Sequence, residues 1–160
     1  MALKPRAKNL SEERVVSTNR KARHDYQILE QLEAGIALTG DEVKSLRSGR
    51  ASLVEAFARV RGGELWLEGM HIPAYEQGNV KKHQPLRPRK LLLHRREIAR
   101  LGGQQLEERL ALVPLRVYFT HGIAKVELAV ARGKRQHEKR QAIAKREHQR
   151  EMERELGRRR

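Results

Sequence analysis

Apolar and polar positions in the middle of the chain follow the patterns of β-strands. Branched and aromatic residues are frequent in Tyr26–Leu38, Val54–Val60 and Glu64–Ile72, and a pair of glycines separates the second segment from the third. Two glycines between such segments are typical of a tight turn, so these two segments predict a β-hairpin. Leu110–Phe119 and Ile123–Ala131 predict a second hairpin across a short turn that contains glycine.

Two other stretches favour helices. Asp41–Ser48 is expected to be a short helix, with Asp41 as its N-cap and Gly49 just beyond its end. Arg95–Arg109 spaces its apolar residues at helical intervals, although we expect a break near Gly102. Five or more strands with a few short helices predict a mainly β fold, an antiparallel barrel of the oligonucleotide-binding (OB) type.

The formal charge of +15 on 160 residues lies mostly at the two ends. Residues 1–24 carry seven Lys or Arg against two Glu, and residues 132–160 carry twelve against five. Such an excess predicts a polyanionic partner, either nucleic acid or an anionic membrane. We therefore expect a basic N-terminal arm at 1–18, a globular domain at 19–131 and a basic C-terminal tail at 132–160.

Several function classes receive little support. No apolar stretch approaches the ~20 residues that span a bilayer, and the first 23 residues lack a secretory signal, so we expect a cytoplasmic protein without membrane contact. The chain has no cysteine, and no two of its seven histidines have the spacing of a helical metal site. We expect no metal, no cofactor and no enzymatic activity. A metal-free nuclease that pairs His24 with Glu33 or Glu42 is the alternative in this class.

The basic tail has a helical repeat. Arg146, Arg150, Arg154 and Arg158 recur at every fourth position, so a helical tail would present a row of arginines. The tail has few large apolar residues with which to dock on the domain. We expect it to be disordered when free and helical when a polyanion neutralises the arginines, with a length of roughly 39 Å.

Two short segments are candidate RNA contacts. In Asn19–Tyr26, three cations are followed by an imidazole and a phenol ring that can stack on bases. On the expected short helix, Lys44 and Arg47 lie three positions apart and could grip phosphates from one face. The first segment is equally compatible with a solvated basic arm, whereas exposed residues such as Lys44 and Arg47 usually just face water.

Four motifs occur in order along the chain: Asn19–Tyr26, Glu33–Gly49, Arg89–His94 and Gly133–Arg140. Together they closely resemble small protein B, the family of bacterial tmRNA-binding proteins. The resemblance covers about residues 19–140, and the rest of the tail resembles that family in composition and charge pattern. It implies an OB-like barrel with short helices, which is similar to the fold expected above.

The resemblance also implies a function. Family members bind the tRNA-like domain of tmRNA and carry it to ribosomes stalled on messages without a stop codon, a process called trans-translation. Their tail forms a helix in the vacant mRNA channel, next to the decoding centre of the small subunit. The delivered complex would include elongation factor Tu, and the protein would act as a monomer.

Residue by residue, the resemblance assigns contacts with the tRNA-like domain to Asn19, Lys21, Arg23, His24, Glu33, Glu42, Lys44, Arg47, Lys90 and His94. It assigns contacts with the ribosome to the tail residues Lys134, Arg135, His137, Lys139, Arg140, Arg146, Arg150 and Arg154. The family often has two lysines and a tyrosine where this chain has Lys134, Arg135 and His137. Composition alone fits one further hypothesis, a structural protein of the ribosome whose tails thread through rRNA.

Overall fold

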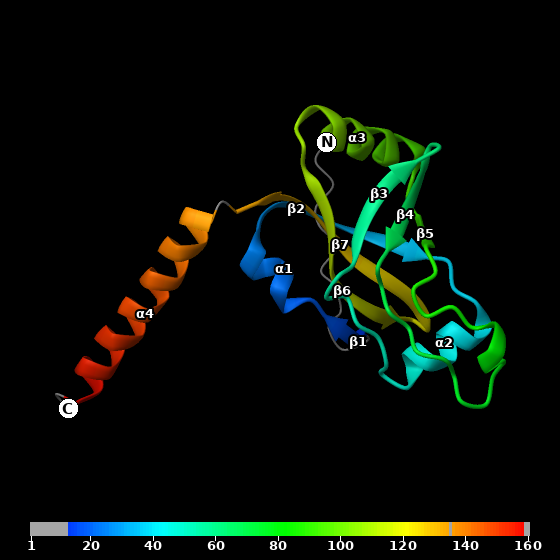
Figure 1. Ribbon diagram of the computed structural model, residues 1–160, viewed down its shortest axis with the longest axis horizontal. Helices are drawn as coiled ribbons and strands as arrows, with labels where there is room; N and C mark the ends of the chain where they lie inside the picture. Colours follow the sequence, from blue (N-terminus) through cyan, green and yellow to red (C-terminus); the bar gives the residue numbers. More distant parts are fainter. Residues whose placement is uncertain (1–12, 135, 159–160) are drawn as a thin grey trace.

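The computed structural model describes residues 13–134 and 136–158, which form a β-barrel with a long C-terminal helix (Figure 1). The strands are β1 (Glu13–Thr18), β2 (Tyr26–Ile36), β3 (Phe57–Arg61), β4 (Glu64–Glu68), β5 (Arg89–Leu92), β6 (Ala111–Thr120) and β7 (Ile123–Gly133). The helices are α1 (Arg20–Asp25), α2 (Gly40–Arg47), α3 (Arg95–Glu107) and α4 (Gln136–Arg158), with a short 3-10 helix η2 (Val80–Lys82).

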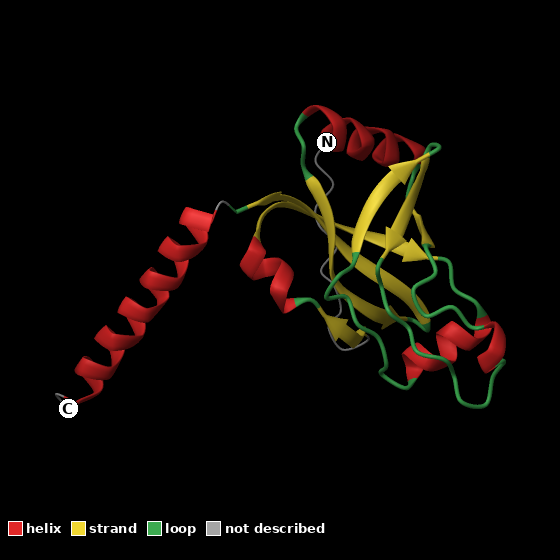
Figure 2. Cartoon of the chain, in the orientation of Figure 1, coloured by secondary structure: helices red, strands yellow, loops and turns green. Residues whose placement is uncertain are grey.

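The strands form one closed antiparallel ring. Neighbours follow the order β6-β3-β4-β5-β2-β7, and pairing between β6 and β7 closes the ring (Figure 2). β1 adds to the free part of β6, where Glu13 lies opposite Thr120. Closure leaves few unpaired edges, which is how small barrels avoid edge-to-edge association. The mainly β, OB-like barrel predicted from the sequence is confirmed.

Both predicted hairpins are present. Gly62 and Gly63 link β3 to β4 with positive φ angles of 61° and 74°, a conformation that glycine adopts without steric cost. β6 turns into β7 between Thr120 and Ile123. The strands β3 and β4 are shorter than predicted: Val54 and Glu55 form a turn before β3, and after β4 only His71 pairs again, in an isolated bridge with Ser52.

Two strands were missed by the sequence pattern. β1 lies within the expected N-terminal arm, so the sheet begins six residues before the expected domain boundary at Asn19. Its register shifts between Val15 and Ser17, which disturbs the alternation that identifies a strand. β5 has only four residues, too few for a periodic signal, yet it directs Arg89 and Leu91 into the interior.

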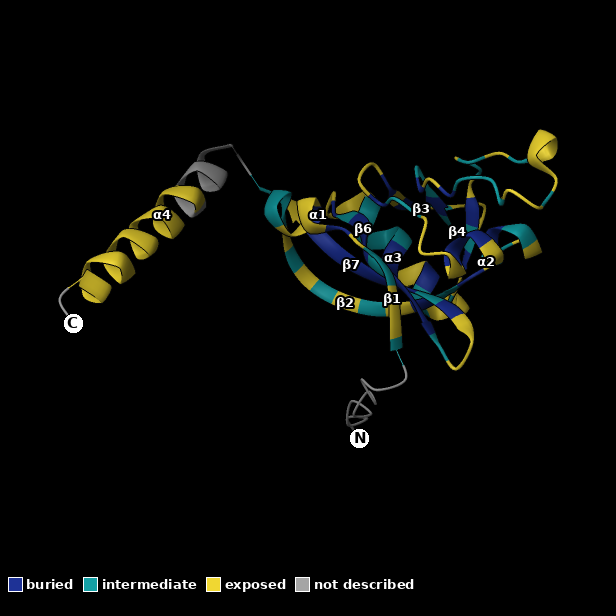
Figure 3. Ribbon diagram, turned by 90° about the horizontal axis from the view of Figure 1, so that it is seen from below, coloured by how far each residue is buried: buried dark blue, intermediate teal, exposed yellow. Residues whose placement is uncertain are grey.

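The main core fills the barrel. Leu65, Leu67, Leu91, Leu112 and Val117 are 0–1% exposed, and each such side chain stabilises the fold by about 1.5–3 kcal/mol. A second, smaller core lies outside the ring, where α1 covers β6 and β7 (Figure 3). It consists of Ala22, Val113, Leu115, Ala129 and Ala131.

The predicted break in the second helix is wrong. α3 runs without interruption through Gly102 and Gly103, and it buries Ile98 and Leu101 against the barrel. A Cβ atom at Gly102 would lie 3.4 Å from Cγ1 of Val60, an ordinary van der Waals contact, so the approach of α3 to β3 does not itself require glycine. The burial of Ile98 and Leu101 offsets the ~1 kcal/mol that glycine costs in a helix.

The predicted N-cap of the short helix is also wrong. Thr39, two residues before Asp41, caps α2: its hydroxyl accepts a hydrogen bond from the Glu42 backbone, and the Glu42 carboxylate accepts one from the Thr39 backbone. Thr39 and Glu42 have the spacing of a capping box. Gly49, with a φ of 78°, follows the end of the helix as predicted.

The C-terminal tail is helical. α4 leaves the barrel after β7 and extends away from it (Figure 1), and its residues 143–158 are all exposed. This differs from the expected disorder of the free tail. Its 23 residues are rich in Ala, Glu, Gln, Lys and Arg, which favour helices intrinsically, and they exceed the ~12–15 residues needed for a marginal isolated helix.

Within the described parts of the chain, no helix is both long and apolar enough to cross a membrane.

Candidate nucleic-acid interface

Asn19 is the structural anchor of α1. It is 4% exposed, and its side-chain oxygen accepts a hydrogen bond from the Ala22 backbone at 3.2 Å. Its amide nitrogen donates to the carbonyls of Leu53 at 3.1 Å and Pro114 at 3.0 Å. The side chain thus ties the start of α1 to β6 and to the loop that precedes β3, and its polar atoms point into the protein.

The other polar residues of α1 are more exposed. Lys21 forms a loose ion pair with Glu55 at 3.7 Å, and both side chains are more than half exposed. Arg23 is exposed, and the imidazole of His24, 44% exposed, lies 3.0 Å from the carboxylate of Asp25. α1 therefore presents cations that a polyanion can reach.

α2 presents a second group of cations. Lys44 and Arg47 are both exposed, as expected from their spacing. The Lys44 ammonium lies 5.5 Å from the centre of the Tyr75 ring, a cation–π distance. The Arg47 carbonyl accepts a hydrogen bond from Arg14 of β1 at 2.7 Å, which fixes the end of α2 against the sheet.

The loop between α2 and β3 connects these two groups. One end carries Arg50, which pairs with Glu76 at 3.6 Å beside Tyr75, and the other end carries Glu55, the partner of Lys21. Asn19 holds the middle of the loop through Leu53. We call α1, α2 and the loop between α2 and β3 the α1–α2 surface, and its exposed cationic residues are Arg20, Lys21, Arg23, Lys44, Arg47 and Arg50.

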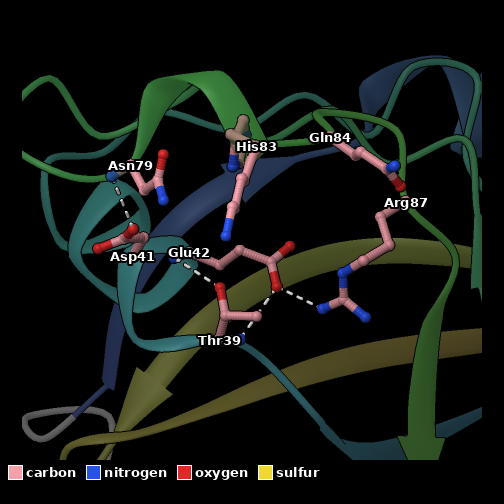
Figure 4. Close-up of a pocket in the computed structure, with 8 residues that line it drawn as sticks. Thr39, Asp41, Glu42, Asn79, His83, Gln84 and Arg87 are labelled. Atoms are coloured by element: carbon pink, nitrogen blue, oxygen red, sulfur yellow. Dashed lines mark hydrogen bonds and ion pairs between the residues drawn. The ribbon is translucent and has the colours of Figure 1, made fainter.

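Glu42 does not lie on this surface. Its side chain is 2% exposed, and it accepts a hydrogen bond from Arg87 (Figure 4). It accepts another from the fully buried Arg89. Arg89 also donates to the carbonyls of Met70 at 2.7 Å and Pro85 at 3.0 Å. Burial opposes the charged form of Glu42, but hydrogen bonds from Thr39, Arg87 and Arg89 outweigh it, and the pKa of Glu42 is lowered. We call Glu42, Arg87 and Arg89 the buried triad.

Glu33 belongs to a polar network on the outer face of the sheet. Its carboxylate accepts a hydrogen bond from the Tyr118 hydroxyl, and the Tyr118 ring lies 4.3 Å below the guanidinium of Arg116. Arg116 in turn donates to Glu127 at 2.5 Å and to Glu13 at 3.0 Å. Burial, followed by the bond to Glu33, raises the pKa of Tyr118 well above its ordinary value of 10.0. The residue Glu33 remains exposed, so a ligand can still reach it.

Lys90 and His94 lie apart from the α1–α2 surface, toward the end of the barrel that carries α3 (Figure 1). Lys90 pairs with Glu64 at 3.0 Å, and both side chains are nearly half exposed. His94 is exposed and immediately precedes α3 as its N-cap residue. The sequence-predicted contacts therefore divide into two exposed groups, α1 with α2 and β5 with α3, together with the sheet residue Glu33 and the buried Asn19 and Glu42.

The predicted tail residues are placed along α4 and just before it. Arg146, Arg150 and Arg154 are exposed on the helix, and the backbone of Lys134 donates to the Asp25 carbonyl at 3.0 Å. Arg135 lies outside the described residues. His137, Lys139 and Arg140 lie within the span of α4.

Sequence patterns missed several residues that build these regions. Arg14, Arg50, Tyr75 and Arg87 come together only through the fold, because their partners lie far along the chain. The structural role of Glu42 had a local signal, since Thr39-Gly40-Asp41-Glu42 is a capping-box sequence.

Comparisons with known proteins agree with the fold and with the order of the motifs. The family described as SmpB protein matches residues 16–158. An SsrA-binding protein from Mycolicibacterium vanbaalenii is 60% identical over 99% of this chain and 96% of its own length. An SsrA-binding protein from Salinispora arenicola is 64% identical over 91% of this chain and 92% of its own.

A solved structure described as "tmRNA-SmpB: a journey to the center of the bacterial ribosome" is similar with a TM-score of 0.64 and 50% identity. The similarity covers 79% of this chain and 93% of that chain. The family match extends from β1 through the barrel to the end of α4. The chain belongs to the SmpB protein family.

Proposed function

We propose that this protein binds the tRNA-like domain of tmRNA and delivers it to stalled ribosomes for trans-translation. The observation that carries the proposal is the α1–α2 surface, where two helices of a family barrel present exposed cations and the loop between α2 and β3 pairs with groups beside both. Cations that reach phosphates position an RNA, whereas base edges and stacking provide specificity. The relatives are named SsrA-binding proteins, and these names support tmRNA as the ligand.

Within this function, the expected contact residues take two roles. Lys21, Arg23, His24, Lys44 and Arg47 would contact the RNA directly, with Lys90, His94 and Glu33 as contacts elsewhere on the barrel. Asn19 and Glu42 would act as positioning residues, because their polar atoms are engaged inside the protein. They hold α1 and α2 in place, so that the neighbouring cations keep a fixed spacing.

The tail would detect the empty mRNA channel. Twenty-three residues at 1.5 Å per residue make α4 about 35 Å long, and its exposed arginines suit a channel lined with rRNA phosphates. We expect Lys134, Arg135, His137, Lys139 and Arg140 to contact rRNA near the decoding centre, and Arg146, Arg150 and Arg154 to lie deeper in the channel. The protein would act in the cytoplasm as a monomer, within a complex that includes elongation factor Tu.

The direct test measures affinity for the tRNA-like domain at several salt concentrations. The variant Lys44→Gln with Arg47→Gln removes two charges from the α1–α2 surface. The control Arg59→Gln with Arg109→Gln removes two exposed charges elsewhere on the barrel. The first variant should bind about tenfold more weakly with a shallower salt dependence, because each lost phosphate contact lowers the slope by about 0.7–0.9. The control should bind like the wild type.

A second measurement separates this function from a structural role in the ribosome. RNA that co-purifies with the native protein should be rich in tmRNA, and the protein should be far less abundant than ribosomal subunits. A constant one-to-one ratio to one subunit, with no tmRNA enrichment, would contradict the proposal.

A further inference from the structure

A pocket of about 250 Å³ lies between the first turn of α2 and the loop that contains η2 (Figure 4). Because one water takes ~30 Å³ of liquid, this space admits a group of several heavy atoms, such as a phosphate. The pocket is not part of the α1–α2 surface as defined above. Its lining residues are Thr39, Asp41, Glu42, Asn79, Lys82, His83, Gln84 and Arg87.

The buried triad gives this pocket an excess of positive charge. One carboxylate, Glu42, is shared by two guanidinium groups, so the three side chains together carry one positive charge. Glu42 and Arg89 are almost completely buried, whereas the Arg87 side chain is 35% exposed. The surplus charge therefore reaches solvent at Arg87, on the wall of the pocket.

One further cation, Lys82 of η2, lines the pocket and is exposed. Its chain neighbour Lys81 is exposed as well, outside the pocket lining. The nearby carboxylate of Asp41 accepts a hydrogen bond from the Asn79 backbone at 3.2 Å, so it is engaged in holding the loop. The acids of the pocket lining, Asp41 and Glu42, thus both have partners within the protein, and the cations of the lining are Arg87 and Lys82.

The loop that carries these cations is fixed to α2 at several points. The Ser45 hydroxyl donates to the Pro73 carbonyl at 2.7 Å, and an imidazole nitrogen of His83 lies 2.6 Å from the Ile72 carbonyl. A Cβ atom at Gly78 would lie only 2.7 Å from the Asp41 carboxylate, so the loop packs directly on the helix. A site fixed in this way loses little conformational freedom when it binds a ligand.

We propose that this pocket binds a backbone phosphate of the tRNA-like domain through Arg87 and Lys82, and that the exposed Lys81 contacts the same RNA backbone beside the pocket. The inference deepens the proposed function, because the same helix would present Lys44 and Arg47 to that RNA. Arg87 provides planar, directed donors, and the two lysines add charge that follows the backbone. The loop 79–87 thereby extends the RNA contact beyond α2.

The test compares two charge-matched variants of the full-length protein. Lys81→Gln with Lys82→Gln removes two charges at and beside the pocket, and Arg59→Gln with Arg109→Gln removes two elsewhere. Affinity for the tRNA-like domain is measured as a function of salt, and hydroxyl-radical footprinting identifies the protected nucleotides. We expect about a threefold to tenfold loss for the pocket variant, a salt slope shallower by about one, and loss of protection at a discrete group of nucleotides.

Each other outcome has a definite meaning. If both variants lose affinity equally, the lysines contribute only general charge and the inference is overturned. If the pocket variant keeps its footprint on the tRNA-like domain and changes only contacts with rRNA, the assigned RNA is wrong. If the wild type does not bind the tRNA-like domain at all, the proposed function itself fails.

Arg87 is tested separately, because it contributes to the fold. Arg87→Gln leaves Glu42 paired with Arg89 one to one, so the triad becomes neutral without an unpaired carboxylate. This variant should melt close to the wild type and should bind RNA about as weakly as the double lysine variant.

Inorganic phosphate, added at constant ionic strength, should compete with the RNA only at millimolar concentrations, because a free ion lacks the neighbouring contacts of the RNA backbone. Tight competition by free phosphate would instead assign the pocket to a small anion.

Discussion

The barrel and the tail of this protein have similar chemical groups but use them differently. In the barrel, buried charges are paired across distant segments, as in the triad of Glu42, Arg87 and Arg89. In α4, the described side chains at 143–158 are exposed. The barrel is therefore stabilised by burial and specific pairing, whereas α4 depends on helix propensity and on whatever it contacts. The difference suits a fixed binding body joined to an element that responds to its surroundings.

Removing the tail should separate these two roles most clearly. A chain that ends at Lys134 keeps all seven strands and the bond from Lys134 to Asp25. We expect its affinity for tmRNA to stay within a few-fold of wild type, while peptide tagging on stalled ribosomes in a purified translation system is abolished. Equal loss of both would mean that the tail is a general RNA anchor.

Breaking the buried triad should affect only the barrel. Glu42→Gln leaves the fully buried Arg89 without a charged partner, which costs about 3–5 kcal/mol. Trp66 of β4 is the single tryptophan of the chain, so its fluorescence reports barrel unfolding alone. The control Glu64→Gln removes a half-exposed pair and should cost less than ~1 kcal/mol. A similar melting temperature for the two variants would contradict the structural role of Glu42.

A proline in the tail should affect only α4. Gln149→Pro interrupts the exposed helix at a local cost of about 3 kcal/mol, whereas Gln149→Ala should be neutral. The proline variant should lose circular dichroism at 222 nm and tagging activity, with unchanged tmRNA binding and unchanged Trp66 melting. Full tagging by the proline variant would show that the tail acts through its charge and not through its helix.

Acid should provide the smallest and most selective effect. The pKa of Glu42 is lowered in the folded state from its ordinary value of 4.5, so its contribution is fully present above that value and is lost as pH falls below it. Barrel stability of the wild type should therefore fall more steeply below pH ~4.5 than that of Glu42→Gln. Parallel curves for the two proteins would place the acid sensitivity in other carboxylates.

Local pattern was enough to predict the barrel and most of its strands, but not all of them. The two hairpin patterns identified β3, β4, β6 and β7, and a fifth strand pattern identified β2. The other two strands depend on long-range pairing: β1 pairs with β6, and β5 pairs with β4 and β2. The helix through Gly102 shows the same limit, because the burial of Ile98 and Leu101 that stabilises it depends on the rest of the fold. At the candidate interface, the sequence motifs correctly placed Lys21, Lys44 and Arg47 on the surface. The same motifs include Asn19 and Glu42, which the fold buries.

The junction between barrel and tail gives the molecule a mechanical property. The backbone of Lys134 is bonded to Asp25, the last residue of α1, and Gly133 pairs with Tyr26 directly after it. A force that pulls or turns α4 is therefore transmitted first to the end of α1. In the proposed function, the tail would work as a lever whose pivot lies at the edge of the α1–α2 surface, so that a load from the ribosome would reach α1, the helix proposed to face the RNA.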